Sequence, residues 1–209
     1  MSVLLDNDVL LKIAIYDLWE PSLEVLGIAP RDVRILPAAR FVFRLNKPGK
    51  TDALYGEGVR KRLQAIVEAA GKVEAPADLT HLAILSAVQG IDAGEAVLFA
   101  TAATEPASLL LTGDKASLMA LVAAPSCAEI VGLLAGRVMC WDQLLLRLLD
   151  HLTFDPLRAR LLPSLDQDGL VRLLFASRLE AREIEVRTGL ASYILHIRRQ
   201  SGVLLLEEG

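Results

Sequence analysis

GIDAGEAVLFATAATEPASLLLTGDK, residues 90–115, is the stretch from which the rest of this chain can be interpreted. Asp92-Ala-Gly-Glu95 fits a capping box, in which two carboxylates three residues apart each accept a backbone N–H at a helix start. The pattern predicts a helix that begins there and ends near Pro106. Ser108–Thr112 is apolar on both faces, as an inner parallel strand should be, and Asp114 follows it closely.

Short apolar strands alternate with helices on both sides of this stretch. Further strands are predicted at 3–5, 33–36 and 137–140, and the tail 203–206 is expected to pair as an edge strand or pack into a groove. Helices are predicted at 9–19, 38–44, 58–70, 77–89, 115–123, 128–135 and 142–152. Asn7 or Asp8 is expected to cap the first helix, Gly71 to end the third, and 46–56 to form a loop.

This alternation, without hairpin signals, predicts an α/β fold with a parallel sheet in a domain spanning residues 1–152. Right-handed crossovers place the carboxyl ends of the strands on one edge, outside which such sheets bind ligands. After residue 152 the pattern is helical, at 157–162, 167–176, 178–187 and 190–199. We expect residues 153–209 to form a helical C-terminal extension that packs on the domain or forms an oligomer interface.

Acidic residues stand where this topology brings chain segments together. Asp6 and Asp114 follow strands, and Glu95 begins a helix at the same edge, with Asp8 and Asp92 as reserves. Converging carboxylates repel one another unless a cation lies between them, and Mg²⁺ or Mn²⁺ suits an all-oxygen site. Such a cluster is a candidate phosphodiesterase centre. Each acid also has a structural interpretation, as a helix cap, a capping-box partner or a turn residue.

Composition excludes several classes of protein. The 209 residues are 53% apolar and 23% charged, which is typical of a folded chain, and 5% aromatic, which argues against an RNA-stacking platform. No run approaches the roughly 20 apolar residues of a membrane span, and the early acids argue against a signal peptide. Cys127 and Cys140 lack metal-type spacing, which favours reduced thiols in a cytoplasmic protein. Phosphate-loop, dinucleotide and serine-hydrolase motifs are absent, and the three histidines are scattered.

Charge is distributed unevenly along the chain, whose net charge is −4. Residues 31–72 contain ten Lys or Arg against four acids, whereas residues 73–114 contain six acids and neither Lys nor Arg. A basic block beside an acidic one could guide a phosphate backbone towards a metal site, although solvated helix faces are the simpler interpretation. The candidate nucleic-acid-binding residues are Arg40, Arg44, Lys47, Lys50 and Lys115.

Three motifs together resemble the PIN-domain nucleases over roughly residues 1–150. Leu4-Leu5-Asp6-Asn7-Asp8-Val9 resembles the family's opening strand, Asp and helix. Asp92-Ala-Gly-Glu95 resembles its later acidic helix start, and Leu111-Thr112-Gly113-Asp114 resembles its strand ending in T-x-D. The resemblance implies a three-layer fold with five parallel strands. It also implies a Mg²⁺- or Mn²⁺-dependent ribonuclease site with Asp6, Glu95 and Asp114 as ligands, and often a small inhibitory protein partner or dimerisation.

The chain departs from that pattern in one place. The family usually has an acid in the helix after its second strand, and here the corresponding position holds Arg40. A catalytically weak or inactive PIN-like interaction module is therefore an alternative to a ribonuclease. A phosphatase of the haloacid-dehalogenase type is a second alternative, because Asp6-Asn7-Asp8 matches its D-x-D motif. The helix predicted directly after Asp8 and the lack of a later G-D-x-x-x-D argue against it.

Overall fold

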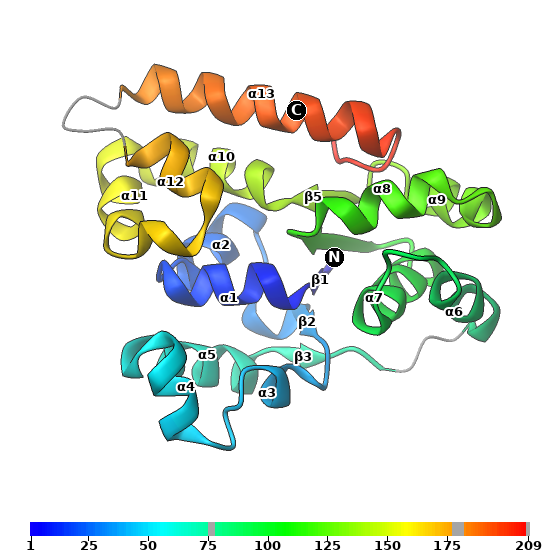
Figure 1. Cartoon of the computed structure of the whole chain (residues 1–209), viewed down its shortest axis with the longest axis horizontal. Coiled ribbons are helices and arrows are strands. Elements are labelled where there is room, and N and C mark those ends of the chain that lie inside the picture. Colours follow the sequence, from blue (N-terminus) through cyan, green and yellow to red (C-terminus); the bar gives the residue numbers. More distant parts are fainter. Residues whose placement is uncertain (75–77, 177–181, 208–209) are drawn as a thin grey trace.

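The computed structural model describes residues 1–74, 78–176 and 182–207, and it has an α/β fold around a five-stranded sheet (Figure 1). All strand pairings are parallel, and the spatial order is β3-β2-β1-β4-β5. The strands are β1 (Ser2–Leu5), β2 (Val33–Ile35), β3 (Gly71–Lys72), β4 (Ser108–Thr112) and β5 (Val138–Cys140). The predicted parallel sheet of about five strands is therefore confirmed.

Helices bury both faces of the sheet and produce three layers. Val3 and Leu5 join one apolar core and Leu4 joins the other, because successive strand residues point to opposite faces. The first core includes α1 (Asn7–Ile15), α2 (Trp19–Leu26), α3 (Ala39–Val42), α5 (Glu57–Ala69), α10 (Trp141–Leu152), α11 (Phe154–Leu161) and α12 (Gly169–Phe175). The second includes α6 (Leu79–Ser86), α7 (Ala93–Thr104), α8 (Lys115–Ala123) and α9 (Ala128–Leu134).

The C-terminal segments lie along the β5 side of the molecule (Figure 1). Helix α13 (Glu183–Ser201) contributes Leu190 to the first core and Ile194 to the second, so it spans both layers. Beyond it, Leu205 forms a parallel bridge with Val138. This bridge confirms that the tail can pair at the edge of the sheet.

The connections create a reversal point in the sheet. From β1 the chain builds β2 and β3 on one side, and then α7 returns it to β4 on the other side of β1. Parallel sheets bind ligands outside the carboxyl ends of the strands at such a reversal. The segments that follow β1 and β4 and the start of α7 meet at this place.

The first predicted helix, at 9–19, is wrong in its extent. Helix α1 ends at Ile15, Asp17 adopts a left-handed conformation with φ of 55°, and α2 begins at Trp19. Pro21 is the third residue of α2, where its missing N–H costs no helical hydrogen bond, so it does not interrupt this helix. The helical spacing of apolar residues continues across Asp17, so the sequence pattern does not reveal that the backbone leaves the helical conformation there.

The expected loop at 46–56 is also wrong, because α4 (Pro48–Tyr55) occupies most of it. Pro48 is the first helical residue, a position that suits proline because its φ is already helical. Buried Thr51 donates its hydroxyl proton towards the carbonyl oxygens of Phe43 and Arg44. The helix is therefore held by a tertiary contact that composition does not reveal. Two 3₁₀ helices lie elsewhere in connections, at Pro30–Asp32 and Pro125–Cys127, and a third at Leu162–Gln167.

Two further predictions, each at a glycine, are wrong. Gly71 does not cap α5, which ends at Ala69, but begins β3, whose two residues are too short to give a pattern. The helices predicted at 178–187 and 190–199 are continuous in α13, with residues 178–181 outside the described chain. A Cβ on Gly189 would lie 2.5 Å from Leu174 Cδ2, so this glycine allows close packing inside a helix.

Other predicted elements agree closely with the structure. Strand β4 and helix α8 have their predicted bounds. Helix α6 is shorter than the predicted 77–89, starting after its N-cap Asp78, while Pro76 and Ala77 lie outside the described residues. Over the described part of the chain no single helix is long and apolar enough to cross a membrane. Among the described helices, α8 and Pro125–Leu134 have the length and composition of a membrane span only when taken together, as a pair bent by 92°.

Candidate functional site

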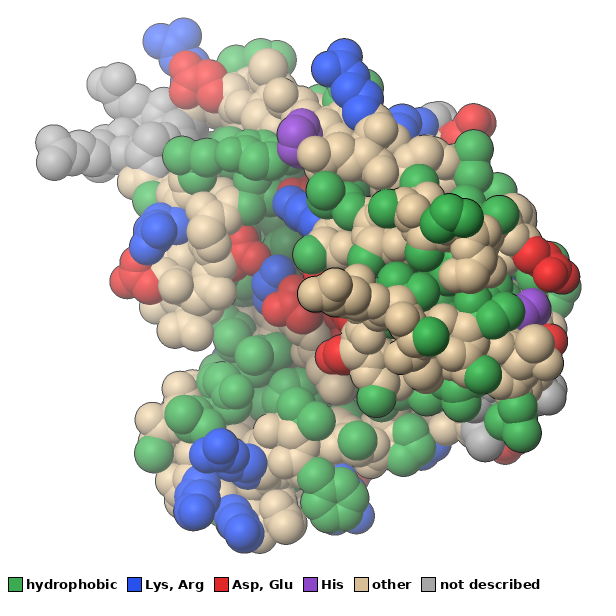
Figure 2. Space-filling view, turned by 45° about the vertical axis from the view of Figure 1, so that its right-hand side comes forward, with side chains coloured by type: hydrophobic (Ala, Val, Ile, Leu, Met, Phe, Trp, Pro, Cys, Tyr) green, Lys and Arg blue, Asp and Glu red, His purple; other side chains and the backbone are tan. Residues whose placement is uncertain are grey.

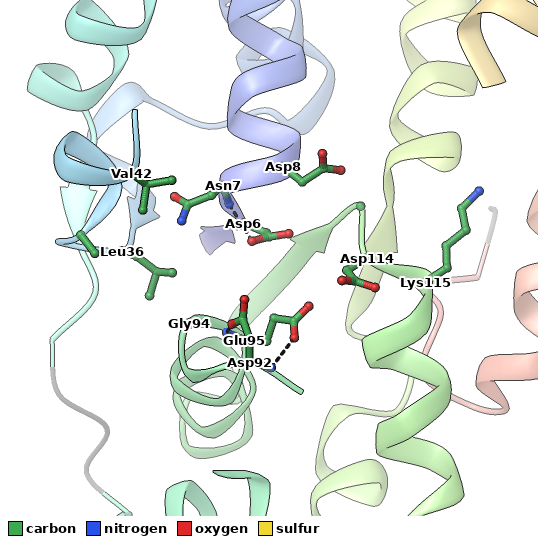
Figure 3. Close-up of a pocket in the computed structure, with 12 residues that line it drawn as sticks. Asp6, Asn7, Asp8, Leu36, Val42, Asp92, Gly94, Glu95, Asp114 and Lys115 are labelled. Carbon is green, nitrogen blue, oxygen red and sulfur yellow. Dashed lines mark hydrogen bonds between the residues drawn. The ribbon is translucent and has the colours of Figure 1, made fainter. Parts of the chain in front are cut away.

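An open cavity of about 680 Å³ lies at the carboxyl edge of β1 and β4. Figure 2 shows this face with acidic side chains in a hollow, hydrophobic ones beside them, and several Lys and Arg on a separate lobe. Five acids line the cavity, namely Asp6, Asp8, Asp92, Glu95 and Asp114. The structure therefore brings all the sequence-predicted acids to one place (Figure 3).

Asp6 lies at the centre of this group and is 8% exposed. It is the N-cap of α1, a role predicted for Asn7 or Asp8. Its Oδ1 accepts the N–H of Asn7 at 2.7 Å, and its Oδ2 accepts the Thr112 hydroxyl proton at 3.2 Å. Burial, together with the nearby charges of Asp8 and Asp92, raises the pKa of Asp6 to about 6. The Asp6 carboxylate is thus held by two hydrogen bonds, but these do not offset the free-energy cost of burying its negative charge.

Glu95 and Asp92 form the predicted capping box of α7. Glu95 Oε2 accepts the N–H of Asp92 at 2.7 Å, and Asp92 Oδ1 accepts the N–H of Glu95 at 2.8 Å. Burial, and then the neighbouring carboxylates of Asp114 and Asp92, raise the pKa of Glu95 to about 7. Glu95 therefore caps α7 and also lies beside the carboxylate of Asp114.

Asp114 is the N-cap of α8 rather than a simple turn residue. Its Oδ1 accepts the N–H groups of Ala116 and Ser117 at 2.8 and 3.0 Å, and its own N–H bonds to Thr112 Oγ1 at 3.1 Å. Thr112 therefore links Asp114 to Asp6 across β4 and β1. Asp6, Glu95 and Asp114 come from three separate elements and point into the same space (Figure 3).

Asp8 lines the cavity but is held at its side by another residue. Lys12 Nζ lies 2.8 Å from Asp8 Oδ2 and 2.9 Å from Asp168 Oδ2, and 5.6 Å from the centre of the Trp141 ring. A Cβ on Gly113 would lie 2.0 Å from Asp8 Oδ2, so any other residue at this position would require this carboxylate to move. Asp8 thus already has a cationic partner, which it shares with Asp168.

The remaining side of the cavity is apolar. Leu36, Ala38 and Val42, from the end of β2 and from α3, line it in place of a further acid. Arg40 lines a separate, smaller pocket, so it puts no positive charge among the acids. Of the predicted nucleic-acid-binding residues, only Lys115 lines the acidic cavity, while Arg44, Lys47 and Lys50 are exposed outside it.

Lys115 points away from the acids and towards α10 (Figure 3). Its Nζ lies 3.1 Å from Oδ2 of Asp142, whose side chain is fully buried, and 5.6 Å from the centre of the Tyr193 ring. Sequence reasoning missed Asp142 and the Lys12–Asp168 pair. Asp142 follows β5 in the way that Asp114 follows β4, and Lys12 stands four residues after Asp8, so signals existed for both.

The donor set suits a hard divalent cation, but the conformation is not a chelating one. Carboxylate oxygens are the ligands that Mg²⁺ and Mn²⁺ prefer, and two of these acids have pKa values raised by burial beside other acids. Within residues 1–74, 78–176 and 182–207, no three His, Cys, Asp or Glu side chains stand close enough together to hold an ion. Asp6, Glu95 and Asp114 each use one carboxylate oxygen to accept a backbone N–H.

The chain matches no protein-family model, no curated protein and no solved structure. Any functional conclusion therefore rests on the geometry and chemistry of this cavity together with the sequence motifs.

Proposed function

We propose that this chain is a metal-dependent nuclease of the PIN type that hydrolyses phosphodiester bonds in RNA. The observation that carries the proposal is the meeting of Asp6, Glu95 and Asp114 in one cavity at the reversal point of a parallel sheet. These are the three positions at which the sequence resembles the family. RNA as the substrate comes from that resemblance.

The three acids would share the binding of Mg²⁺ or Mn²⁺. Capping uses Oδ1 of Asp114 and Oε2 of Glu95, which leaves the second oxygen of each for a ligand. Asp6 is fixed in place by Asn7 and Thr112. A bound ion would neutralise the acids, polarise a phosphoryl oxygen and lower the pKa of a water molecule.

Titration with Mn²⁺ by calorimetry tests the proposal. We expect the wild-type chain to bind Mn²⁺, and the double variant Asp6→Asn with Asp114→Asn to lose that binding. Asp166→Asn is the matched control, because Asp166 is an exposed acid in the 3₁₀ helix 162–167, outside the cavity. Mn²⁺-dependent cleavage of a labelled single-stranded RNA should follow the same order. Absence of binding at millimolar Mn²⁺ would contradict the nuclease proposal.

An interaction module without catalysis is the second candidate. It is favoured by the apolar wall of Leu36, Ala38 and Val42 and by the present spacing of the carboxylates. Such a module would show no Mn²⁺ binding, and substitution of the acids would leave partner binding intact. The phosphatase alternative is less well supported, since α1 begins at Asn7 with no turn after Asp6. Vanadate or fluoroberyllate inhibition of phosphate-ester hydrolysis would reveal a phosphatase.

A further inference from the structure

Helix α3 separates two cavities of opposite character. Its N-cap Ala38 and its last residue Val42 line the acidic cavity, whereas Arg40 lines a separate pocket of about 170 Å³. Leu36 lines both cavities, so they are neighbours. Since a helix is about 10 Å across with its side chains, the two cavities lie about one helix diameter apart.

The smaller pocket has an excess of positive charge. Arg40 and Lys72 both line it, and the positive charge of Arg40 adds to the burial that lowers the pKa of Lys72. Lys72 Nζ already donates to two backbone carbonyl oxygens, which leaves one of its three N–H groups for a ligand. Glu68 is the acid along this pocket, and its Oε1 already accepts an N–H from Gln64 at 3.0 Å. The guanidinium of Arg40 forms no hydrogen bond or ion pair with any residue in the described part of the chain. Because Arg40 is exposed, its guanidinium is accessible to a ligand with a negative charge.

An exposed aromatic ring stands beside this arginine. Phe41 is 63% exposed although burial of such a ring would be favourable, and the Arg40 guanidinium carbon lies 5.9 Å from its centre. One exposed ring does not make the multi-base platform that the low aromatic content argues against, but an arginine or aromatic face can stack a single unpaired base. Exposed Arg44, Lys47 and Lys50 follow in the chain, which gives the surrounding surface the charge that a phosphate backbone needs.

We propose that α3 forms a subsite for a nucleotide next to the scissile phosphate, with its base stacked on Phe41 and its phosphate bound by Arg40 and Lys72. The segment bound at this subsite would be single-stranded, because paired bases are not free to stack. This inference deepens the proposed nuclease and rests on it for the location of the scissile phosphate. It also gives a role to Arg40, the residue that stands where the family usually has an acid.

The test measures the binding of a short fluorescein-labelled single-stranded RNA by anisotropy, in EDTA so that cleavage does not compete. Loss of base stacking costs about 1–3 kcal/mol, so Phe41→Ala and Phe41→Leu should weaken binding roughly fivefold to a hundredfold. Phe41→Tyr should bind like wild type. Leu173→Ala is the control, because Leu173 is 60% exposed on α12, which lies apart from α3 in the fold (Figure 1). Full affinity in Phe41→Leu would overturn the stacking role in favour of a general apolar contact.

Two further measurements sharpen the result. A duplex of the same sequence should bind more weakly than the single strand, and equal affinity would overturn the single-strand assignment. Arg40→Ala should reduce the slope of log affinity against log salt by about 0.7, the share of one phosphate contact on a single strand. An unchanged slope would remove Arg40 from the phosphate contact.

The subsite and the nuclease can fail separately. Hydrolysis of bis(p-nitrophenyl) phosphate with Mn²⁺ requires the acids but neither stacking nor a second phosphate, so Phe41→Ala should leave it unchanged. If RNA binds through Phe41 but neither substrate is hydrolysed, the subsite stands and the proposed nuclease is wrong. If hydrolysis occurs and Phe41 variants bind RNA like wild type, the subsite alone is wrong.

Discussion

Two opposing demands act on the Asp6 side chain. Its side chain caps α1 and bonds to Thr112, which requires it to be buried, yet burial disfavours its charge. The folded chain holds the Asp6 proton up to a pKa of about 6, whereas the unfolded chain releases it near 3.8. The folded state therefore binds more protons between these values, and stability from this group falls as pH rises through them.

Asp6→Asn should remove this pH dependence. The full cost of the raised Asp6 pKa at pH 8 is about 3 kcal/mol, and asparagine keeps a capping oxygen while carrying no charge. We expect the variant to be more stable than wild type by about 1–3 kcal/mol at pH 8 and nearly equal to it at pH 4. Urea unfolding in EDTA at both pH values measures this difference, with Asp166→Asn as the control. An equal loss of stability at both pH values would contradict the account.

Lys12 is a second residue whose charge should contribute strongly to the stability of the fold. It is nearly buried between Asp8 and Asp168, and Asp168 also caps α12 by accepting the N–H of Val171 at 2.9 Å. Lys12→Met would leave a buried carboxylate without its cation, so we expect a loss of about 3 kcal/mol in the free energy of unfolding. In an Asp168→Asn background, the same substitution should cost at least 1 kcal/mol less. Strictly additive losses in this double-mutant cycle would show that the pair is not coupled.

At the scale of the element, the start of α7 carries both a structural and a proposed chemical role. A capping box needs a hydrogen-bond acceptor at its third position, which glutamine supplies as well as glutamate. A metal site needs the negative charge, which glutamine lacks. The two roles of Glu95 can therefore be separated by one conservative substitution.

Glu95→Gln should leave the free energy of unfolding at pH 8 within about 0.5 kcal/mol of wild type or raise it, because the charged form of Glu95 is disfavoured by burial. The same variant should lose Mn²⁺ binding in calorimetry. Asp92→Ala removes the N-cap acceptor and should cost about 1 kcal/mol, whereas Asp92→Asn should not. Retention of full Mn²⁺ affinity by Glu95→Gln would reduce Glu95 to its structural role.

At the scale of the whole molecule, the helices after residue 152 complete the core that α1 and α10 begin. Leu157, Leu161, Val171 and Phe175 are buried in the same cluster as the apolar side chains of α1. The Lys12–Asp168 ion pair adds a polar link between α1 and the start of α12. Removal of this segment would therefore expose apolar surface on α1 and α10 as well as delete residues.

A chain ending at residue 152 should aggregate or lose its cooperative thermal transition. The comparison is a chain ending at Leu206, which keeps the tail that bonds to Val138 and Gln143. Size-exclusion chromatography and thermal unfolding distinguish the two. A monodisperse truncated chain with an unchanged melting temperature would show that the C-terminal helices are only an appendage.

Local physical chemistry explains which parts of this protein were predictable. The bounds of β4 and α8, the α7 capping box and the strand-end positions of Asp6 and Asp114 all follow from hydrophobic pattern and capping within a few residues. The break at Asp17 and the two-residue strand β3 were not predicted. They depend on backbone conformation and on pairing with a distant strand, which leave no periodic pattern.

The sequence by itself determined a parallel α/β sheet and a small set of acids at strand and helix ends, because both follow from short-range patterns and the rules of strand connection. Only the tertiary structure decided how those acids are used. It paired one oxygen of Glu95 and one of Asp114 with backbone N–H groups, and it placed Lys12 between Asp8 and Asp168. It also placed Arg40 outside the acidic cavity. These outcomes depend on distances and burial between residues far apart in the chain, which pattern and spacing along a sequence do not contain.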